Sequence, residues 1–332
     1  MIISRTPFRI SFFGGGTDYP GWFQENRGAV LATTIDKYCY ISCRYLPPFF
    51  EHRSRIIYSK MEHVHTVDEI HHPAVREVLR FMKIEEGVEI HHDGDLPART
   101  GLGSSSAFTV GLLHGLYAMK GVMLTKERLG KEAIHIEQDM CKENVGCQDQ
   151  MLAAFGGFNH IEFGGNQHLN VRRVTISDDK LKILQQHMML YFTGFSRTAS
   201  DVAAHQIQNI PNKTKELQIM HDMVAEAISI LNTERLGDFG KLLHESWKLK
   251  RGLSGKISTP HIDEIYETAR SAGAIGGKLL GAGGGGFVLI FAAPEAQPKI
   301  SEKLSKLLLV PFKFESLGSQ IIFYQPNTGQ VD

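Results

Sequence analysis

Short runs of β-branched and aromatic residues dominate the first half of the chain. They cover Ile2–Phe13, Ala32–Tyr45 and Val88–His92, and they predict strands because such side chains fit a pleated, half-buried surface. Helices are expected over Ser105–Met119 and over Thr125–Lys142, and in the second of these Leu129, Ala133, Ile136 and Met140 fall on one face. The second of these begins with a threonine, a residue type that caps helices well.

The second half of the chain alternates between helical and extended patterns. The expected strands are residues 188–193, 287–291, 310–314 and 320–324, and the expected helices are 212–231, 235–250, 262–272 and 295–307. Residues 170–180 are largely polar and break the pattern, which favours a domain boundary near 175–185. The whole pattern predicts an α+β protein with two domains in tandem.

Composition and charge narrow the classes of function. The 332 residues are 42% hydrophobic and 22% charged, which is typical of globular proteins. Lysine plus arginine and aspartate plus glutamate both number 36, so there is no basic excess for nucleic acid or a membrane surface. No apolar run approaches the roughly 20 residues that span a bilayer, and the N-terminus lacks a signal-peptide pattern. We therefore expect a cytoplasmic protein without a nucleic-acid or membrane partner.

One stretch, Pro97-Ala-Arg-Thr-Gly-Leu-Gly-Ser-Ser-Ser-Ala107, combines glycines with hydroxyl groups. Gly101 and Gly103 leave the backbone open, and the serines lead into an expected helix. Backbone N–H groups and a helix N-terminus that point to one place bind anions, and serine hydroxyls bind phosphate oxygens or Mg²⁺. The same residues also fit a turn that only caps a helix. By itself, the stretch leaves both interpretations open.

Two further glycine clusters adjoin strands, Gly14–Gly16 after the first strand and residues 276–286 before a later one. Clustered glycines let the backbone approach a ligand closely, although they also form ordinary tight turns. Residues 281–286 fit Gly-x-Gly-x-x-Gly but precede a strand instead of opening a helix, which is the wrong context for dinucleotide binding. A Walker A loop also fails, because Ala272 and Leu279 stand where its glycine and its hydroxyl would be.

Taken in order, the three clusters resemble the motifs of the GHMP kinases, named for galacto-, homoserine, mevalonate and phosphomevalonate kinases. The first motif is similar to Pro7-Phe8-Arg9 through Gly14-Gly15-Gly16-Thr17-Asp18, the second to Pro97 through Ala107, and the third to Lys278 through Gly286. The resemblance implies a two-domain GHMP kinase fold. Residues 1–178 would form an N-terminal mixed α/β nucleotide-binding domain, and residues 179–332 a C-terminal ferredoxin-like domain.

The resemblance implies a kinase that uses ATP and Mg²⁺, with the second motif as the loop that holds the ATP phosphates. Ser105 lies where the family places its Mg²⁺-binding serine, and Glu137, about three helical turns before Asp149, matches the acidic partner. Independently, Glu137 falls on the flank of the apolar face of its expected helix, where a carboxylate needs a partner such as a cation. The implied phosphate-binding residues are Pro97, Gly101, Leu102, Gly103, Ser104, Ser105, Ser106 and Ala107.

The resemblance also assigns the catalytic groups. Asp149 lies in Gly146-Cys147-Gln148-Asp149-Gln150, which is similar to the stretch that holds the general base in galactokinase-like members. Such a carboxylate takes the hydroxyl proton as the oxygen attacks the γ-phosphorus. Arg9 matches the Arg or Lys that the family places beside this aspartate, where it would help to stabilise the transferring phosphoryl group.

The first motif bears on the acceptor. Asp18 matches the sugar-binding aspartate of galactokinase, but Gly15 and Gly16 replace the Glu-His pair of that enzyme, which speaks against galactose. Residues 5–20 look more like the branch that phosphorylates heptose 7-phosphates and fucose at the anomeric hydroxyl. We expect transfer to O1 of D-glycero-D-manno-heptose 7-phosphate, giving the 1,7-bisphosphate for nucleotide-activated heptose synthesis. The implied substrate contacts are Gly15, Gly16, Thr17, Asp18, Arg197, Gly283 and Gly284.

Several alternatives remain open from the sequence. Fucose, another free sugar or a mevalonate-like alcohol could replace the heptose phosphate, and a catalytically silent sensor of sugar or ATP is the alternative of a different class. The sequence also leaves open whether the chain forms a homodimer. A sugar phosphate needs cationic anchors, for which the candidates are Arg53, Arg55, Arg197, Lys248 and Arg251.

Overall fold

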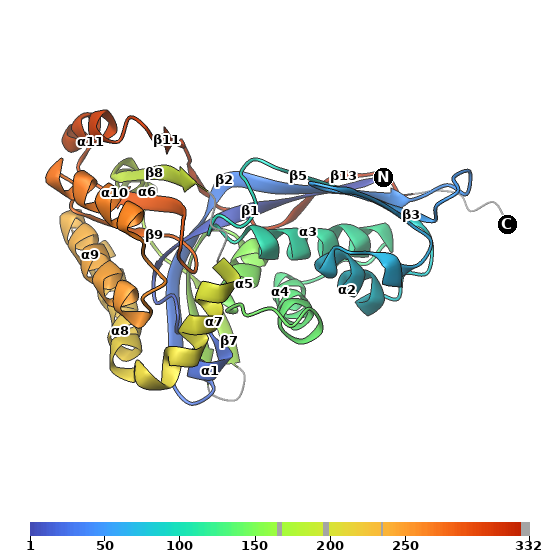
Figure 1. Ribbon diagram of the computed structural model, residues 1–332, viewed down its shortest axis with the longest axis horizontal. Helices are drawn as coiled ribbons and strands as arrows, with labels where there is room; N and C mark the ends of the chain where they lie inside the picture. Colours follow the sequence, from blue (N-terminus) through green and yellow to red (C-terminus); the bar gives the residue numbers. More distant parts are fainter. Residues whose placement is uncertain (165–167, 195–198, 234, 327–332) are drawn as a thin grey trace.

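The computed structural model describes residues 1–164, 168–194, 199–233 and 235–326, which form two sheets with helices packed against them (Figure 1). The described part of the larger, nine-stranded sheet consists of β1 (Ile2–Phe13), β2 (Gly28–Tyr45), β3 (Ser54–Ile57), β4 (Met61–Val64), β5 (Val88–Gly94), β6 (Phe158–Gly164), β7 (His168–Arg173), β12 (Phe314–Glu315) and β13 (Gln320–Tyr324). The smaller, four-stranded sheet consists of β8 (Met188–Gly194), β9 (Gly276–Leu279), β10 (Gly286–Phe291) and β11 (Leu308–Leu309).

The helices fall into two groups along the chain. The first group is α1 (Pro20–Phe23), α2 (Pro73–Phe81), α3 (Ser104–Met119), α4 (Lys126–His135) and α5 (Gln148–Phe155). The second group is α6 (Asp178–Gln186), α7 (Ala199–Asn209), α8 (Thr214–Leu231), α9 (Leu236–Leu253), α10 (Pro260–Ser271) and α11 (Gln297–Lys303). Among the described helices, none is long and apolar enough to cross a membrane.

The long strand β2 organises the larger sheet. It pairs along its length with β1, and on its other side with β6 at its beginning and β5 at its end, all antiparallel. Two strands from the end of the chain join the same sheet, since β12 pairs with β2 and β13 pairs with β1. The larger sheet is therefore built from both halves of the sequence.

Helix α3 lies directly on β1 and β2, and two glycines allow this close approach. A Cβ at Gly111 would lie 2.8 Å from the Thr6 hydroxyl oxygen, and one at Gly115 would lie 3.1 Å from the Cys43 sulfur. Because these glycines are four residues apart, they share one face of the helix. The first turn of α3 is thereby held above the end of β1, where Arg9 lies.

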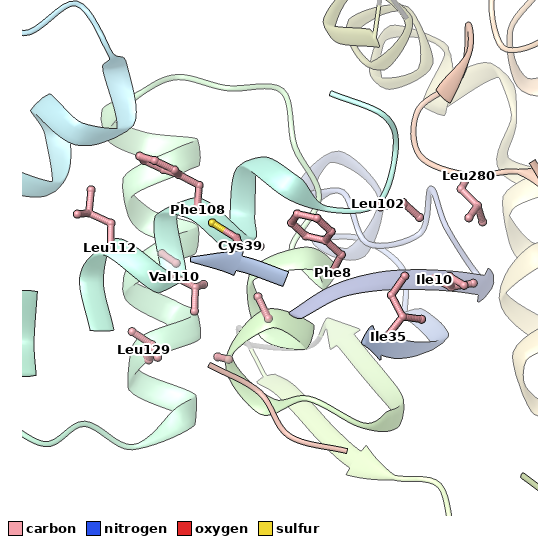
Figure 2. Packing of buried hydrophobic residues seen from close by; sticks show 14 of the residues in the cluster. Phe8, Ile10, Ile35, Cys39, Leu102, Phe108, Val110, Leu112, Leu129 and Leu280 are labelled. Carbon is pink, nitrogen blue, oxygen red and sulfur yellow. The ribbon is translucent and has the colours of Figure 1, made fainter. Parts of the chain in front are cut away.

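One buried cluster joins α3 and the larger sheet to two glycine-rich loops. These are the loop before α3, residues 97–103, and the loop between β9 and β10, residues 280–285. The cluster includes Phe8 and Ile10 of β1, and also Leu102 and Leu280, which are 0% and 1% exposed (Figure 2). Each of the two loops thus has a leucine fixed in the same core while its glycines remain at the surface of that core. This anchoring holds the two loops in a constant relative position.

The smaller sheet confirms the expected ferredoxin-like fold. Its order is β11-β8-β10-β9, with antiparallel pairing throughout, so that the strands follow the order 4-1-3-2 of a βαββαβ unit. Trp247 of α9 and Tyr266 of α10 are buried in the second apolar cluster, beneath this sheet. The domain boundary between residues 178 and 179 stays a prediction. Strands β12 and β13 lie after that boundary in the sequence, yet they pair with β2 and β1 of the larger sheet.

Most expected elements are present, and the differences have local causes. Thr125 does cap α4, since its hydroxyl accepts from the Arg128 N–H at 3.2 Å. The expected single helix over 125–142, however, ends as α4 and passes into a π-helical turn at Ile136–Met140. The expected strand over 310–314 does not form as one element, because β11 ends at Leu309, β12 begins only at Phe314, and Pro311 between them lacks a ladder N–H.

Candidate active site

An arginine–aspartate pair lies where β1 meets α5. The Arg9 guanidinium donates from Nε and Nη2 to the two Asp149 carboxylate oxygens, at 2.6 and 2.7 Å. Asp149 is in the first turn of α5, and its side chain stays 23% exposed while that of Arg9 is 7% exposed. The bidentate contact fixes the orientation of the carboxylate, and its exposed side remains accessible to a substrate.

The loop before α3 is held against this pair. The Arg9 Nη1 donates to the Gly101 carbonyl at 2.6 Å, and the Arg9 backbone N–H donates to the Leu102 carbonyl at 3.0 Å. A Cβ at Gly103 would lie 3.3 Å from an Asp149 carboxylate oxygen. Gly101 and Gly103 have φ values of +85° and +74°, so the loop needs glycine there. Pro97 through Ala107 therefore places a helix N-terminus beside the Arg9–Asp149 pair, which is an arrangement suited to anions.

The turn after β1 brings a second aspartate to the same region. The Asp18 carboxylate is 3% exposed and accepts from the Gly16 N–H at 2.9 Å and from the Gln148 side-chain amide at 2.8 Å. A Cβ at Gly146 would lie 1.9 Å from an Asp18 carboxylate oxygen, so a larger residue there would displace the Asp18 side chain. Burial raises the pKa of Asp18, and the nearby Asp149 raises it further. Thr17, by contrast, donates to the backbone carbonyl of Gly14, and its hydroxyl shapes the turn.

Glu137 is buried in a pocket of neutral donors. It lies in the π-helical turn and is 1% exposed. Its carboxylate accepts from the hydroxyls of Ser106 and Thr109 at 2.8 and 2.7 Å, and from the Gln150 side-chain amide at 2.5 Å. Burial raises the pKa of Glu137 to about 7. Ser105, which the sequence analysis paired with Glu137, has its side chain exposed in the first turn of α3, and Ser106 is the serine that contacts Glu137.

The glycine-rich loop between β9 and β10 packs against the loop before α3. A Cβ at Gly281 would lie 2.4 Å from the Gly101 Cα, and one at Gly286 would lie 2.3 Å from the Thr100 carbonyl oxygen. Farther along the loop, the Gly284 N–H donates to the Ile257 carbonyl at 3.0 Å. The second and third sequence motifs therefore meet backbone to backbone, although about 180 residues separate them in the chain.

Two buried lysines at the site were missed by the sequence analysis. Lys250, in the last turn of α9, is 5% exposed and donates to the Gly281 carbonyl. Lys278 of β9 is 2% exposed and donates to the Phe12 carbonyl at 2.8 Å. Burial lowers the pKa of both, that of Lys250 to about 8. The helical spacing of α9 carried a signal, since Lys250 continues the apolar face of Leu243 and Trp247.

The predicted cationic anchors are spread over the molecule. Arg55 contacts Glu89 on the larger sheet, Lys248 pairs with Glu245, and Arg251 pairs with Asp263. Arg197 lies outside the described residues. A cavity of about 300 Å³ opens beside the glycine-rich loop, and its polar lining includes Asp201, Lys256, Ser258, Thr259 and Gly284.

Comparisons with known proteins found relatives that match both halves of the chain. Residues 69–157 match the GHMP kinases N terminal domain, and residues 224–308 match the GHMP kinases C terminal domain. A D-glycero-alpha-D-manno-heptose 7-phosphate kinase of Campylobacter jejuni is 30% identical over 92% of this chain and 93% of its own length. An L-fucokinase/L-fucose-1-P guanylyltransferase of Bacteroides fragilis is 25% identical over 92% of this chain and 36% of its own length.

Solved structures share the whole fold. A crystal structure described as a D-glycero-D-manno-heptose 1-phosphate kinase from Bacteroides thetaiotaomicron has a TM-score of 0.73 and 24% identity. That comparison covers 98% of this chain and 100% of the other. A phosphomevalonate kinase from Streptococcus pneumoniae has a TM-score of 0.75 at 15% identity, covering 95% of this chain and 100% of the other. At these identities, the structures show the fold alone.

Proposed function

The chain belongs to the GHMP kinase family and is a small-molecule kinase, and from this premise we propose that it phosphorylates the anomeric O1 of D-glycero-D-manno-heptose 7-phosphate with ATP. The observation that carries the proposal is the 30% identity to a heptose 7-phosphate kinase over 92% of the chain. The product would be the 1,7-bisphosphate, for nucleotide-activated heptose synthesis.

Asp149 is the proposed general base and Arg9 its partner. The acceptor hydroxyl transfers its proton to the Asp149 carboxylate while its oxygen bonds to the γ-phosphorus, and the bond from that phosphorus to the β–γ bridging oxygen breaks. The bidentate contact with Arg9 holds the carboxylate in one orientation. Arg9 also contacts the loop before α3, so the base and the proposed phosphate site are aligned by the same side chain.

The residues around Glu137 fit a hard cation. Its buried carboxylate has hydroxyl and amide donors as partners, and the Gln150 side-chain oxygen beside it is buried without a hydrogen-bond partner. Among the residues that the structure describes, no three His, Cys, Asp or Glu side chains gather into a metal cluster. Glu137 and Ser105, which the resemblance to the family implies, stay the proposed Mg²⁺ ligands, and Ser106 would hold the Glu137 carboxylate. Bound Mg²⁺ would neutralise phosphate charge.

The acceptor would bind between the turn after β1 and the glycine-rich loop. Asp18 can accept from sugar hydroxyls, and Gly15 and Gly16 leave room beside it. The cavity that borders Gly284 contains Lys256, whose ammonium donates to the His205 ring. We assign the distal phosphate of the sugar to this cavity, because Lys256 supplies a cation there.

The fucokinase relative supports free fucose as a second candidate acceptor. The silent-sensor alternative is disfavoured by the intact Arg9–Asp149 pair, which a protein that only binds sugar has no need to keep aligned with a phosphate loop.

A coupled ADP-release assay across acceptors tests the proposal. We expect the highest kcat/KM with D-glycero-D-manno-heptose 7-phosphate, and lower values with fucose, galactose and mevalonate. Phosphorus NMR of the product identifies phosphate on the anomeric oxygen. Faster turnover of free fucose than of the heptose phosphate would overturn the proposed acceptor, and turnover of no acceptor would overturn the proposed kinase reaction.

A further inference from the structure

Lys250 is a buried cation at the candidate active site, and it takes no part in the reaction steps proposed for Asp149 and Arg9. It lies in the last turn of α9, with Trp247 one turn before it and Leu253 after it, both buried. Lysine is almost never buried without a partner, because removing an ammonium group from water is costly. A lysine that is 5% exposed on an otherwise apolar helix face therefore requires an explanation.

The hydrogen bonds of Lys250 are incomplete. Its ammonium can donate three hydrogen bonds, and among the described residues its one acceptor is the Gly281 carbonyl. Gly281 packs on Gly101, and the Gly101 carbonyl accepts from Arg9. Arg9 and Lys250 thus reach the contact between the two glycine loops from different elements, one from β1 and the other from α9.

Neither Lys250 nor the neighbouring Lys278 contacts a carboxylate among the described residues, since each donates to a backbone carbonyl. Arg9 and Lys278 are the cations that face Lys250, from β1 and β9, and Asp18 and Asp149 are the facing carboxylates, from the turn after β1 and from α5. Arg9 and Asp149 already neutralise each other in a bidentate pair. Cations gathered in a buried site repel one another, and a polyanion placed against the first turn of α3 would offset that repulsion.

We propose that Lys250 is a catalytic residue that donates hydrogen bonds to the γ-phosphoryl group of ATP during its transfer, together with Arg9. This inference rests on the proposed kinase reaction. Lys250 keeps its proton throughout: the acceptor proton goes to Asp149, the new O–P bond forms, and ADP leaves with the bridging oxygen. The ammonium stabilises the charge on the phosphoryl oxygens as that bond breaks.

The alternative is that Lys250 only ties α9 to the glycine-rich loop. A structural tie would support both nucleotides equally, whereas a γ-phosphoryl contact acts on the triphosphate alone. Calorimetric titration with AMPPNP and with ADP separates the two roles, and it does so without an acceptor. Lys250→Met removes the ammonium, Lys250→Arg retains a cation, and Lys241→Met is the matched control on an exposed position of the same helix.

We expect Lys250→Met to weaken AMPPNP binding by about tenfold or more, which is typical of a lost charge-assisted hydrogen bond, and to change ADP binding less than threefold. Lys241→Met should change neither. Equal weakening of both nucleotides, or no weakening of AMPPNP, would overturn the catalytic assignment. If Lys250→Met fails to fold, the pH dependence of kcat/KM of Lys250→Arg decides between the catalytic and the structural role.

Kinetics provide the second measurement. Lys250→Met should lower kcat with the heptose phosphate by about 100-fold or more. The pH dependence of kcat/KM for ATP reports the pKa values of groups in the free enzyme. In the wild type, kcat/KM should fall above about pH 8, because the pKa of Lys250 lies there. Lys250→Arg should lack this fall. Persistence of the fall in Lys250→Arg would assign it to Lys278 and contradict the proposal. A wild-type enzyme inactive on every acceptor would refute the proposed reaction, while the nucleotide titrations would still decide the role of Lys250.

Discussion

Replacement of Gly101 by alanine tests whether the two glycine loops must touch for catalysis. A Cβ at Gly101 would lie 2.4 Å from the Leu280 carbonyl oxygen and 3.2 Å from the Gly281 Cα. Ordinary contacts of a Cβ begin at 3.4 Å, and both neighbours are backbone atoms that cannot turn aside. One loop must therefore move by about 1 Å, and such a displacement of groups that align the reactants costs about 100-fold in rate.

Gly121, after α3, provides a control for the backbone effect. Its φ of +70° is close to the +85° of Gly101, but a Cβ there would meet no atom within 4 Å. An alanine in this left-handed conformation costs about 1–2 kcal/mol at either position. We therefore expect Gly101→Ala and Gly121→Ala to share this loss of stability, and Gly101→Ala alone to lose about 100-fold in kcat/KM for ATP.

Thermal unfolding and the ADP-release assay measure the two effects separately. Gly121→Ala should retain kcat/KM within about twofold of the wild type, because surface changes away from the site have small effects. A Gly101→Ala enzyme with kcat/KM within threefold of Gly121→Ala would refute the reasoning, since the loop contact would then not align the phosphates.

Three further substitutions address individual groups. Asp149→Asn should leave nucleotide affinity intact by calorimetry and lower turnover by about 10²–10⁴-fold, as loss of a general base does; unchanged turnover would contradict the assignment. Asp18→Asn should raise the melting temperature at pH 7.5 more than at pH 4. Because burial raises the pKa of Asp18 in the folded protein, the stability of the wild type falls as the pH rises above the ordinary pKa of 3.8. The asparagine side chain does not ionise, so the variant does not lose this stability. The unpartnered Gln148 side-chain oxygen can accept from the new amide, and an equal effect at both pH values would contradict this explanation. Lys256→Met should raise KM for the heptose phosphate about tenfold, as loss of a charge-assisted hydrogen bond does, and leave KM for ATP unchanged; a shift in KM for ATP instead would place the cavity at the nucleotide.

The apolar, β-branched and aromatic runs were sufficient to predict several of the elements. Helix α3 and strands β1, β8 and β13 lie within one or two residues of the ranges expected from the apolar pattern. The pairs β3–β4 and β6–β7 were not predicted, because their short runs are interleaved with charged and histidine residues. Their pairing depends on contacts with β5 and β2, which are distant in sequence, and local patterns do not encode such contacts.

The motifs identified the Arg9–Asp149 pair and both glycine loops, but they did not reveal what surrounds them. Glu137 was expected at the margin of an apolar face. The π-helical turn, in which the Cys141 N–H donates to the Ile136 carbonyl at 2.8 Å, lies in the segment that carries it into the interior. A regular helical wheel across that turn cannot place its side chains correctly. Lys250 was missed because its role depends on contacts with Gly281, in another part of the chain.

The return of β13 to the larger sheet has a consequence for synthesis of the protein. Strand β1 is made long before β13, so one of its edges receives its partner only when residues 320–324 have left the ribosome, since Ile2 pairs with Tyr324. Until then, that edge is free to pair with other nascent chains, and such unpaired edges promote aggregation. The smaller sheet, whose strands all lie between residues 188 and 309, can close earlier. The larger sheet, whose first strands precede those of the smaller sheet in the sequence, is therefore completed after it.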